Sequence, residues 1–494
     1  MEQLHLRGGV FRDRETRRGY SRDMSGYRVT PLLVAEPRDE EDVERTLAYA
    51  MHTGATLTCR GAGSNLSGSA VGRGILVSFK RMQEIRLEGR RARVGPGTVY
   101  SRLNRQVFGR GLSLRYDVSS GGFSTVGGNV ATRAGGLRSI RYGTVDRALA
   151  GVRFLDPVHG LVDTAEGLPP ALAREVRSLR GELLADTEAV DFLERRRGLK
   201  SSSGYNLYAL LDHRDPAGMV AHLMTGSVGT LGLFTSLDMD LVDLQKKRSL
   251  YVAFFETTVH AAEAALDIAA SGPSALEHMD RFGVGLIRRQ SDLPVPEKAG
   301  SVLLVELESD PGGRKHGELG RILDDRALSH RRIDGGEAER LWKMRWTMLT
   351  RIKKTWEDAD HRFISFVDDL AVPPPVLPSF IRDIDRVLSR EELLTVIYGH
   401  IGEGNLHIRP LVARRGWRET VRRLGERCFN VALEHGGTLV AEHGMGRNRC
   451  AYLDWEWGRV GRYFRRVKEL FDPRGLLNPG TLFHCRDFTA DFRF

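Results

Sequence analysis

The amino-acid sequence predicts an α+β protein built from two or three domains. With 494 residues the chain is too long for one hydrophobic core, since cores stop growing at roughly 250–300 residues. Short apolar strands alternate with helical segments in the first quarter of the chain, and a new series of strands and helices begins near residue 243. We therefore expect a first domain over residues 1–242 and a second domain from residue 243.

The first quarter has the pattern of a βαβ unit. Acidic residues open its helix and Gly54 closes it, and the flanking strands are rich in apolar and β-branched residues. The pattern predicts, in order, a strand at 31–37, a helix at 38–54, strands at 55–61 and 75–82, a strand, turn and helix over 92–111, and helices over 170–196.

The second half alternates strands and helices again. We expect strands at 249–257 and 301–309, a helix at 260–271, and a surface turn at the proline cluster 371–378. This arrangement is typical of an α+β substrate domain with an antiparallel sheet.

Composition narrows the class of protein. No apolar run reaches the ~18 residues of a membrane span, and the N-terminus lacks the apolar segment of a signal peptide, so we expect a cytoplasmic protein. The net charge of +10 is compatible with an anionic membrane surface, contacted peripherally, or with nucleic acid. The arginines alternate with acidic and apolar residues at helical spacing and no nucleic-acid recognition motif is present, so we expect solvated helix faces and no nucleic-acid partner.

Four cysteines are spread over the chain, at positions 59, 428, 450 and 485. They form no CxxC or other cluster spacing, which predicts that the chain carries no iron–sulfur cluster of its own.

Glycine-rich loops recur between the expected strands. The loops are RGAGSNLSG (60–68), VGPG (94–97), STVGGNVATRAGG (124–136) with RYGTVD (141–146), and GSVGTLG (226–232). Glycine lets backbone approach a ligand phosphate closely, because it has no side chain and adopts positive φ. None of the loops has Rossmann or Walker spacing, and each loop taken singly is equally well explained by structure alone.

The succession of four such loops resembles the PCMH-type FAD-binding domain of the vanillyl-alcohol oxidase superfamily, also called the FAD-linked oxidases. The resemblance implies a two-subdomain FAD-binding domain over 1–242, a substrate domain over 243–460, and a C-terminal segment, 461–494, that packs back on the FAD domain. It implies FAD contacts by Arg60, Gly61, Ala62, Gly63, Ser64, Asn65, Gly97, Ser124, Thr125, Val126, Gly127, Gly128, Asn129, Tyr142, Gly143, Gly229, Thr230, Gly232 and Asn478.

Three departures from that family pattern bear on the flavin. Ser64 stands where members with covalent FAD often have histidine, so we expect a noncovalent flavin. The segment RYDVSS (115–120) lacks the usual proline, and Val228 stands where glutamate is common. These changes are expected to reshape the flavin pocket.

Two later segments concentrate histidine and glutamate. In LLTVIYGHIGEGNLHIRP (393–410), a hairpin would bring His400, at the end of one strand, next to His407, at the start of the other. In GGTLVAEHGMG, Glu442 is expected at the end of a further strand. Two imidazoles and a carboxylate make a three-ligand site for a divalent metal with a position left for substrate. The alternative is that each histidine only satisfies backbone groups.

The two histidine segments also resemble the paired C-terminal signatures of the FAD-dependent D-2-hydroxyacid dehydrogenases, which act on D-lactate, glycolate or D-2-hydroxyglutarate. Further matching segments include KSSSGYNL (200–207), PSALEHMDR (273–281), LWKMR (341–345), DDLAVPPPVL (368–377) and LFDPRGLLNPG (470–480). The resemblance implies Zn²⁺ or Mn²⁺ on His400, His407 and Glu442, His443 as catalytic base, and Arg345 as the clamp of the substrate carboxylate. Glu403, between the two histidines, replaces the more usual Asp of the family. Arg409 stands where some 2-hydroxyglutarate enzymes have Asn.

Elementary chemistry agrees with these roles. A divalent cation lowers the pKa of a bound hydroxyl, and a histidine with an ordinary pKa of about 6.5 can take the proton. A guanidinium binds a carboxylate through two parallel hydrogen bonds. Arg345 has an alternative role, because it can pair with Glu339 or Glu357 on a helix; Lys353 and Lys354 are further carboxylate-binding candidates.

The sequence therefore predicts a dehydrogenase that oxidises a D-2-hydroxy acid to the 2-oxo acid by metal-assisted hydride transfer to FAD. Electrons would pass to a separate acceptor, namely a quinone, a cytochrome or an iron–sulfur partner, and a homodimer is an open option. One alternative is a metal-independent FAD enzyme of the same superfamily, an oxidase of a sugar or aryl alcohol or a lipid synthase. The other is a non-catalytic subunit or a basic nucleic-acid-binding protein.

Overall fold

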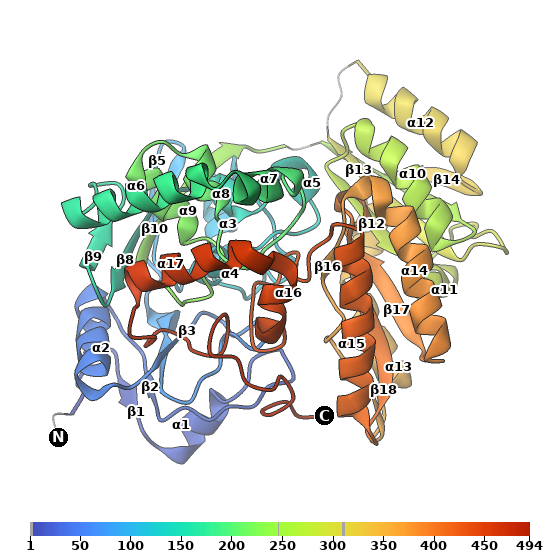
Figure 1. Cartoon of the computed structure of the whole chain (residues 1–494). Helices are drawn as coiled ribbons and strands as arrows, with labels where there is room; N and C mark the ends of the chain where they lie inside the picture. The colour runs from blue at the N-terminus through green and yellow to red at the C-terminus, as the bar shows by residue number, and fades with distance from the viewer. Residues whose placement is uncertain (1–2, 246, 309–311) are drawn as a thin grey trace.

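The computed structural model describes residues 3–245, 247–308 and 312–494, so position 309 of the expected strand 301–309 lies outside the described residues. Within these ranges the strands form three sheets, two in the N-terminal half and one in the second half (Figure 1). Helices cover all three, which confirms the predicted α+β class.

The first sheet contains the expected βαβ unit. Its strand order is β1 (Val10–Phe11), β2 (Leu33–Ala35), β4 (Ile75–Ser78) and β3 (Leu57–Arg60), with β2, β4 and β3 parallel. Helix α2 (Glu40–Thr53) begins where the Asp39 side chain accepts from the Asp42 amide, and ends at Gly54 with φ 70°. The short helix α1 (Arg14–Gly19) lies outside this sheet.

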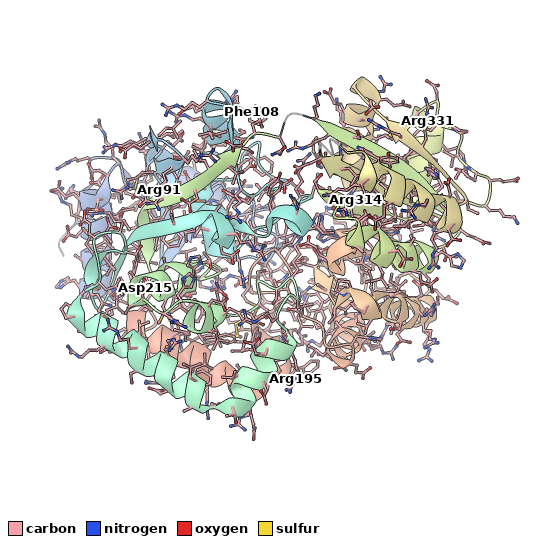
Figure 2. The ribbon with its side chains drawn as sticks, turned by 90° about the horizontal axis from the view of Figure 1, so that it is seen from above. Arg91, Phe108, Arg195, Asp215, Arg314 and Arg331 are labelled. Carbon is pink, nitrogen blue, oxygen red and sulfur yellow. A yellow bond between two sulfur atoms is a disulfide. The ribbon has the colours of Figure 1, made fainter. Side chains whose placement is uncertain are left out.

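The second sheet has the order β5-β6-β10-β8-β9, with β7 also paired to β10. Its strands are β5 (Ile85–Glu88), β6 (Arg91–Val94), β7 (Leu112–Leu114), β8 (Leu149–Asp156), β9 (Gly160–Asp163) and β10 (Leu233–Asp243). The helices of this half are α3 (Tyr100–Phe108), α4 (Val126–Thr132), α5 (Ser139–Tyr142), α6 (Pro170–Ala185), α7 (Thr187–Arg195), α8 (Tyr208–Asp212) and α9 (Pro216–Leu223). In Figure 2, which looks down on α6 and α7, these two helices run along the edge of the molecule and end at Arg195.

The third sheet is antiparallel, with the order β14-β11-β13-β12-β17-β18-β15 and β16 paired to β18. Its strands are β11 (Arg248–Phe255), β12 (Ala275–Met279), β13 (Ser301–Glu308), β14 (Ser329–Ile333), β15 (His361–Phe363), β16 (Leu370–Ala371), β17 (Thr395–Gly399) and β18 (Asn405–Ala413). The helices around it are α10 (Thr258–Ala270), α11 (Arg281–Gln290), α12 (Arg314–Arg326), α13 (Gly336–Trp356), α14 (Leu377–Arg390) and α15 (Trp417–Glu434).

Alternation along β13 explains why both faces of this sheet are covered. Leu303 and Val305 belong to the apolar cluster that includes α10, α14 and α15, whereas Val302 and Leu304 belong to the cluster that includes α11 and α13. The proline cluster at 371–378 forms the end of β16, a 3-10 turn at Pro374–Val376 and the start of α14.

The C-terminal segment returns to the N-terminal half, as predicted. Helix α16 (Leu453–Trp457) precedes the segment, and α17 (Gly461–Phe471) begins it; Phe471 packs edge-on against Phe154 of β8. Leu477 pairs with Leu57 of β3, and a disulfide between Cys450 and Cys485 ties the segment to the 3-10 turn Cys450–Tyr452, just before α16. In the part of the chain that is described, no helix has the length and apolar character to span a bilayer.

Candidate functional site: a cavity between glycine loops and a histidine cluster

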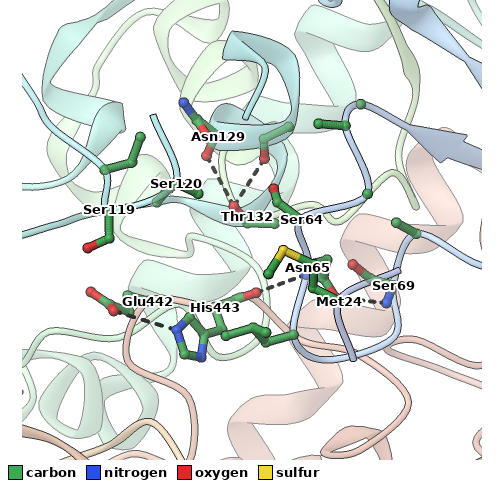
Figure 3. Close-up of a pocket in the computed structure, with 18 of the residues that line it drawn as sticks. Met24, Ser64, Asn65, Ser69, Ser119, Ser120, Asn129, Thr132, Glu442 and His443 are labelled. Carbon is green, nitrogen blue, oxygen red and sulfur yellow. Dashed lines mark hydrogen bonds and ion pairs between the residues drawn. The ribbon is translucent and has the colours of Figure 1, made fainter. Parts of the chain in front are cut away.

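A cavity of about 570 Å³ lies where the N-terminal half meets the third sheet. The glycine loops line one side of it, and His400, His407, Glu442 and His443 line the other. Figure 3 shows Glu442 and His443 beside Asn65, with Asn129 and Thr132 of α4 across the cavity. The volume is within the range of small-molecule and cofactor pockets.

The first glycine loop offers free backbone donors to this cavity. Among the described residues, the amides of 61–65 donate no hydrogen bond to another protein group. The loop is held from behind, because the Asn65 side chain accepts from the Ser67 and Ser69 amides and donates to the His443 carbonyl at 3.1 Å. Gly63 has φ 73°, a conformation that favours glycine. Consecutive free amides of this kind form an anion-binding concavity.

The structure brings most, but not all, of the predicted flavin residues to the cavity. Its lining includes Arg60, Gly61, Ala62, Gly63, Ser64, Asn65, Thr125, Gly127, Gly128, Asn129, Gly229 and Gly232. The lining does not include Gly97, Ser124, Val126, Tyr142, Gly143, Thr230 or Asn478.

Two of the residues outside the lining have clear structural roles. The Asn478 amide donates to the carbonyls of Ser69, at 2.8 Å, and Val228, at 2.7 Å, and so joins two of the loops. The Tyr142 hydroxyl contacts the carboxylate of Glu308, at 2.5 Å.

The expected histidine hairpin is present. Strands β17 and β18 pair antiparallel with Tyr398 opposite His407, and a 3-10 turn over Ile401–Glu403 joins them. The expectation that Glu442 ends a strand is wrong. Residues 436–443 form a loop with one isolated bridge, Ala371 to Thr438, because the side chain of Asp369 takes the place of a partner strand. It accepts from the backbone amides of Ala441 (3.1 Å), Glu442 (3.0 Å) and His443 (2.9 Å).

Both hairpin histidines point one ring nitrogen at the Glu442 carboxylate. His400 Nε2 is 3.1 Å from Glu442 Oε2, and His407 Nε2 is 3.3 Å from Glu442 Oε1. The opposite ring nitrogens face further acids: His400 Nδ1 is 2.5 Å from Glu277, and His407 Nδ1 is 3.1 Å from Asp368. All five side chains are at most 9% exposed. A carboxylate on Nδ1 fixes the tautomer in which Nε2 has a free lone pair, the arrangement of histidines that bind metals.

His443 lies next to this group. Its ring stacks on that of His407 with centroids 5.3 Å apart, and its Nδ1 is 3.4 Å from Asp368 Oδ2. Its Nε2 is 3.6 Å from Glu442 Oε1. Burial opposes a charge on His443, but Asp369 and Asp368 outweigh burial and raise its pKa to about 9. For His400, burial is likewise outweighed by Glu277 and Glu442, and its pKa rises to about 9.

Arg345 lines the cavity but pairs with neither Glu339 nor Glu357. Its Nη2 is 2.6 Å from Glu277, and its guanidinium lies 4.8 Å over the ring of Tyr398. It therefore holds the acid that faces His400, while its Nε has no protein partner in the described residues. Lys353 also lines the cavity, whereas Lys354 does not.

Four functional candidates had no role assigned from the sequence. Glu277 and Asp368 orient the two histidines, and Asp369 holds the Glu442 loop. Lys200, only 7% exposed, places its Nζ 3.0 Å from Glu442 Oε2 and 3.2 Å from Glu403. The motifs KSSSGYNL, PSALEHMDR and DDLAVPPPVL contain all four, so their position in these motifs was the available signal.

Comparison with known proteins decides the family. Residues 244–482 match the family described as FAD linked oxidases, C-terminal domain, and residues 31–164 match an FAD binding domain. Glycolate oxidase subunit GlcD of Escherichia coli K12 is 30% identical, covering 94% of this chain and 87% of the relative. The chain belongs to the FAD-linked oxidase family. This confirms the resemblance drawn from the motifs.

Other relatives of this FAD-linked oxidase match over nearly their whole length. A D-lactate dehydrogenase of Archaeoglobus fulgidus is 27% identical over 91% of this chain and 90% of the relative. A D-2-hydroxyglutarate dehydrogenase of Stutzerimonas stutzeri is 24% identical over 96% of each. The solved structure of an alkyldihydroxyacetonephosphate synthase has the same fold, with a TM-score of 0.66, 18% identity, and coverage of 95% of this chain and 82% of that one.

The residues present fit FAD and could also hold a divalent metal. The free amides of 61–65 suit a pyrophosphate, and the cavity has the size of a cofactor site. For a metal, the donor set is two Nε2 atoms and one carboxylate, with further acids behind them. Asp369, His407, Glu442 and His443 form an overlapping group whose ligand atoms lie within 4.8 Å of one another. The Asp369 oxygens already accept three backbone amides, so we favour the set with His400.

Proposed function

We propose that this FAD-linked oxidase oxidises the CH–OH group of a D-2-hydroxy acid to a 2-oxo acid, with noncovalent FAD as hydride acceptor and a divalent metal, Zn²⁺ or Mn²⁺, held by His400, His407 and Glu442. The named relatives act on glycolate, D-lactate and D-2-hydroxyglutarate. The observation that carries the proposal is the convergence of two buried Nε2 atoms on the Glu442 carboxylate, inside the cavity that the glycine loops line.

When bound, the cation would supply Lewis acidity toward the substrate hydroxyl, and FAD would supply an acceptor for two electrons. The protein supplies binding and proton transfer. Arg345 presents its Nε side to the substrate carboxylate, because Glu277 already occupies Nη2. His443 takes the hydroxyl proton at Nε2, the nitrogen that faces Glu442, while Asp368 and Asp369 hold Nδ1.

Lys200 and Asp369 support this arrangement from behind. The Lys200 ammonium holds Glu442 Oε2, which leaves Oε1 facing His407 and His443. Asp369 keeps the loop that carries Glu442 and His443 in place through its three amide contacts. Neither residue needs to touch substrate for this role.

Anaerobic flavin reduction tests the proposal. Purified protein is mixed with D- and L-enantiomers of 2-hydroxy acids, and bleaching of the flavin is followed before and after chelation and metal readdition. We expect bleaching by at least one D-2-hydroxy acid, its loss with chelator and its return with Zn²⁺ or Mn²⁺. His400→Ala should lose the metal and the bleaching but keep its flavin.

The outcomes separate the alternatives. Bleaching that survives both chelator and His400→Ala would assign the chain to a metal-independent oxidase of the same family. A flavin that no hydroxy acid reduces would refute the proposal.

A further inference from the structure

Six exposed or half-exposed arginines lie together at one edge of the molecule without acidic partners. We call Arg18, Arg22, Arg28, Arg493, Arg414 and Arg418 the basic edge. None of their guanidinium groups forms an ion pair with a carboxylate of the described residues. Some exposed arginines elsewhere are paired, as Arg459 and Arg462 are with Asp186, the residue that precedes α7. The basic edge therefore carries positive charge that no ion-paired carboxylate of the described residues offsets.

The chain folds so that the two ends of the sequence build this edge together. Arg22 and Arg28 face each other in an antiparallel bridge, and the Arg493 amide donates to the Gly26 carbonyl at 2.8 Å. The nearness of Arg22, together with burial, Arg18 and Arg493, lowers the pKa of Arg28. Like charges repel one another, so a cluster of arginines that forms no ion pair with the described carboxylates is maintained at a cost to the folded state.

The edge continues across the second half of the molecule. Arg493 shares a surface hollow with Arg414 and Arg418, which follow β18 and begin α15, and Arg414 lies 5.5 Å over the ring of Phe494. Glu419 is the acid in the lining of that hollow. Figure 1 shows α1, the C terminus and the start of α15 on the same lower side. The positive charge thus extends over a broad face rather than a single helix.

Two aliphatic side chains project from the same segment. Met24, between Arg22 and Arg28, is 57% exposed, and Leu32 is 58% exposed, more than any other large apolar residues described. An anionic bilayer presents negative headgroups above acyl chains, which complements guanidinium groups interspersed with exposed aliphatic side chains. A folded acidic partner would match the charge alone.

We propose that the basic edge docks on an anionic phospholipid bilayer. Met24 also lines the cofactor cavity, and its amide donates to the carbonyl of Gly63 in the first glycine loop, at 3.0 Å. Docking therefore brings the mouth of the cavity to the lipid surface. A lipid-soluble acceptor would then reach the flavin from the bilayer.

Sedimentation with vesicles tests the docking, using intact protein with its flavin. The probes are vesicles of phosphatidylcholine alone and of equal parts phosphatidylcholine and phosphatidylglycerol, near physiological ionic strength. We expect wild-type protein to sediment with the mixed vesicles only. Reversing two charges, in Arg22→Glu/Arg493→Glu, should lower the bound-to-free ratio at least about tenfold, because each basic residue near such a surface contributes on the order of 1 kcal/mol.

A matched control lies on the opposite side of the N-terminal half. Arg174 and Arg177 are exposed on α6, which runs along the top in Figure 1, and neither forms an ion pair with a described residue. Arg174→Glu/Arg177→Glu changes the net charge equally and should bind the mixed vesicles as wild type does. Leu32→Ser should weaken binding without changing the salt dependence.

Three results would overturn the docking proposal: no binding of wild-type protein to the mixed vesicles, wild-type binding by Arg22→Glu/Arg493→Glu, or an equal loss in the α6 control. If wild type ignores vesicles while the basic-edge variant is reoxidised more slowly by ferricyanide, the arginines serve an anionic acceptor instead. Substrate-driven bleaching of the flavin is measured separately, so failure of the docking and failure of the proposed function are distinguishable.

Discussion

The variant Glu277→Gln tests whether His400 is a metal ligand. Glu277 is fully buried and contacts His400 Nδ1 at 2.5 Å and Arg345 Nη2 at 2.6 Å. The change removes a negative charge and leaves the volume nearly the same. His400 then loses the group that fixes its tautomer, and Arg345 loses its ion-pair partner.

Two magnitudes follow from these contacts. Removing the acid behind a ligating histidine weakens metal binding about 10–100-fold. Breaking a buried ion pair costs about 3–5 kcal/mol, and the lower end applies because the glutamine oxygen still accepts one hydrogen bond. We therefore expect a lower unfolding temperature together with a weaker metal affinity, measured by competition with a chromophoric chelator.

Glu306→Gln is the matched control. Glu306 is 3% exposed on the neighbouring strand β13 and contacts Arg138 at 2.7 Å, but it contacts no histidine in the part of the chain that the structure describes. The Glu306→Gln variant should lower the unfolding temperature about as much as Glu277→Gln does, and it should leave the metal affinity unchanged. If Glu277→Gln binds metal as tightly as wild type, or if both variants weaken it equally, His400 is not oriented by Glu277 for metal binding and the assignment fails.

Three other changes have defined outcomes. Lys200→Met removes a cation 3.0 Å from Glu442 and should raise divalent-metal affinity by about tenfold, measured with the same chelator; lower affinity would contradict the electrostatic reading. Asn478→Ala removes the two hydrogen bonds that join Ser69 and Val228 and places alanine at φ 44°, so we expect a loss of about 2–3 kcal/mol and weaker FAD retention on gel filtration. Burial, and to a lesser extent the nearby charge of His213, lowers the pKa of His222 to about 4. The unfolded chain therefore binds more protons than the folded chain between pH 6.5 and 4, and the free energy of unfolding falls as the pH falls through that window. His222→Gln should remove about 2 kcal/mol of this acid destabilisation in unfolding-temperature profiles, and parallel profiles for the two proteins would contradict it.

Local patterns were enough to locate the elements that carry the hairpin histidines. The apolar, β-branched run before His400 and the turn glycines after it determine β17, the turn and β18, so the approach of His400 and His407 follows from short-range sequence. Glu442 was misplaced because a run such as TLVAE has strand composition, yet a carboxylate 73 residues away in sequence satisfies its amides. Strand propensity depends on neighbouring residues in the sequence and cannot predict a partner that only the tertiary fold brings close.

Glu277 and Lys200, the residues that contact the candidate metal ligands, could not be predicted from local sequence for the same reason. Glu277 lies 123 residues from His400, and Lys200 reaches Glu403 across 203 residues. Periodicity identifies β12 as a buried strand, and a glutamate in a buried strand has no predictable partner until the fold brings His400 and Arg345 to it. Asn478 was expected near FAD; its side chain joins the carbonyls of Ser69 and Val228, two residues of the cavity lining, and its role toward FAD stays a prediction.

The buried acids of the site need more positive charge than the neighbouring Arg and Lys side chains supply. Glu277, Asp368, Asp369 and Glu442 are buried together, and the fixed cations that contact Glu277, Asp368 and Glu442 are Arg345, Arg409 and Lys200, respectively. Lys200 is shared with Glu403, so the acids outnumber the fixed cations. Without a further cation, the histidines take up protons to balance these acids. The pKa values of His400 and His443 are therefore raised to about 9. A divalent ion would replace those protons, so metal uptake by this chain should release protons into a weakly buffered solution.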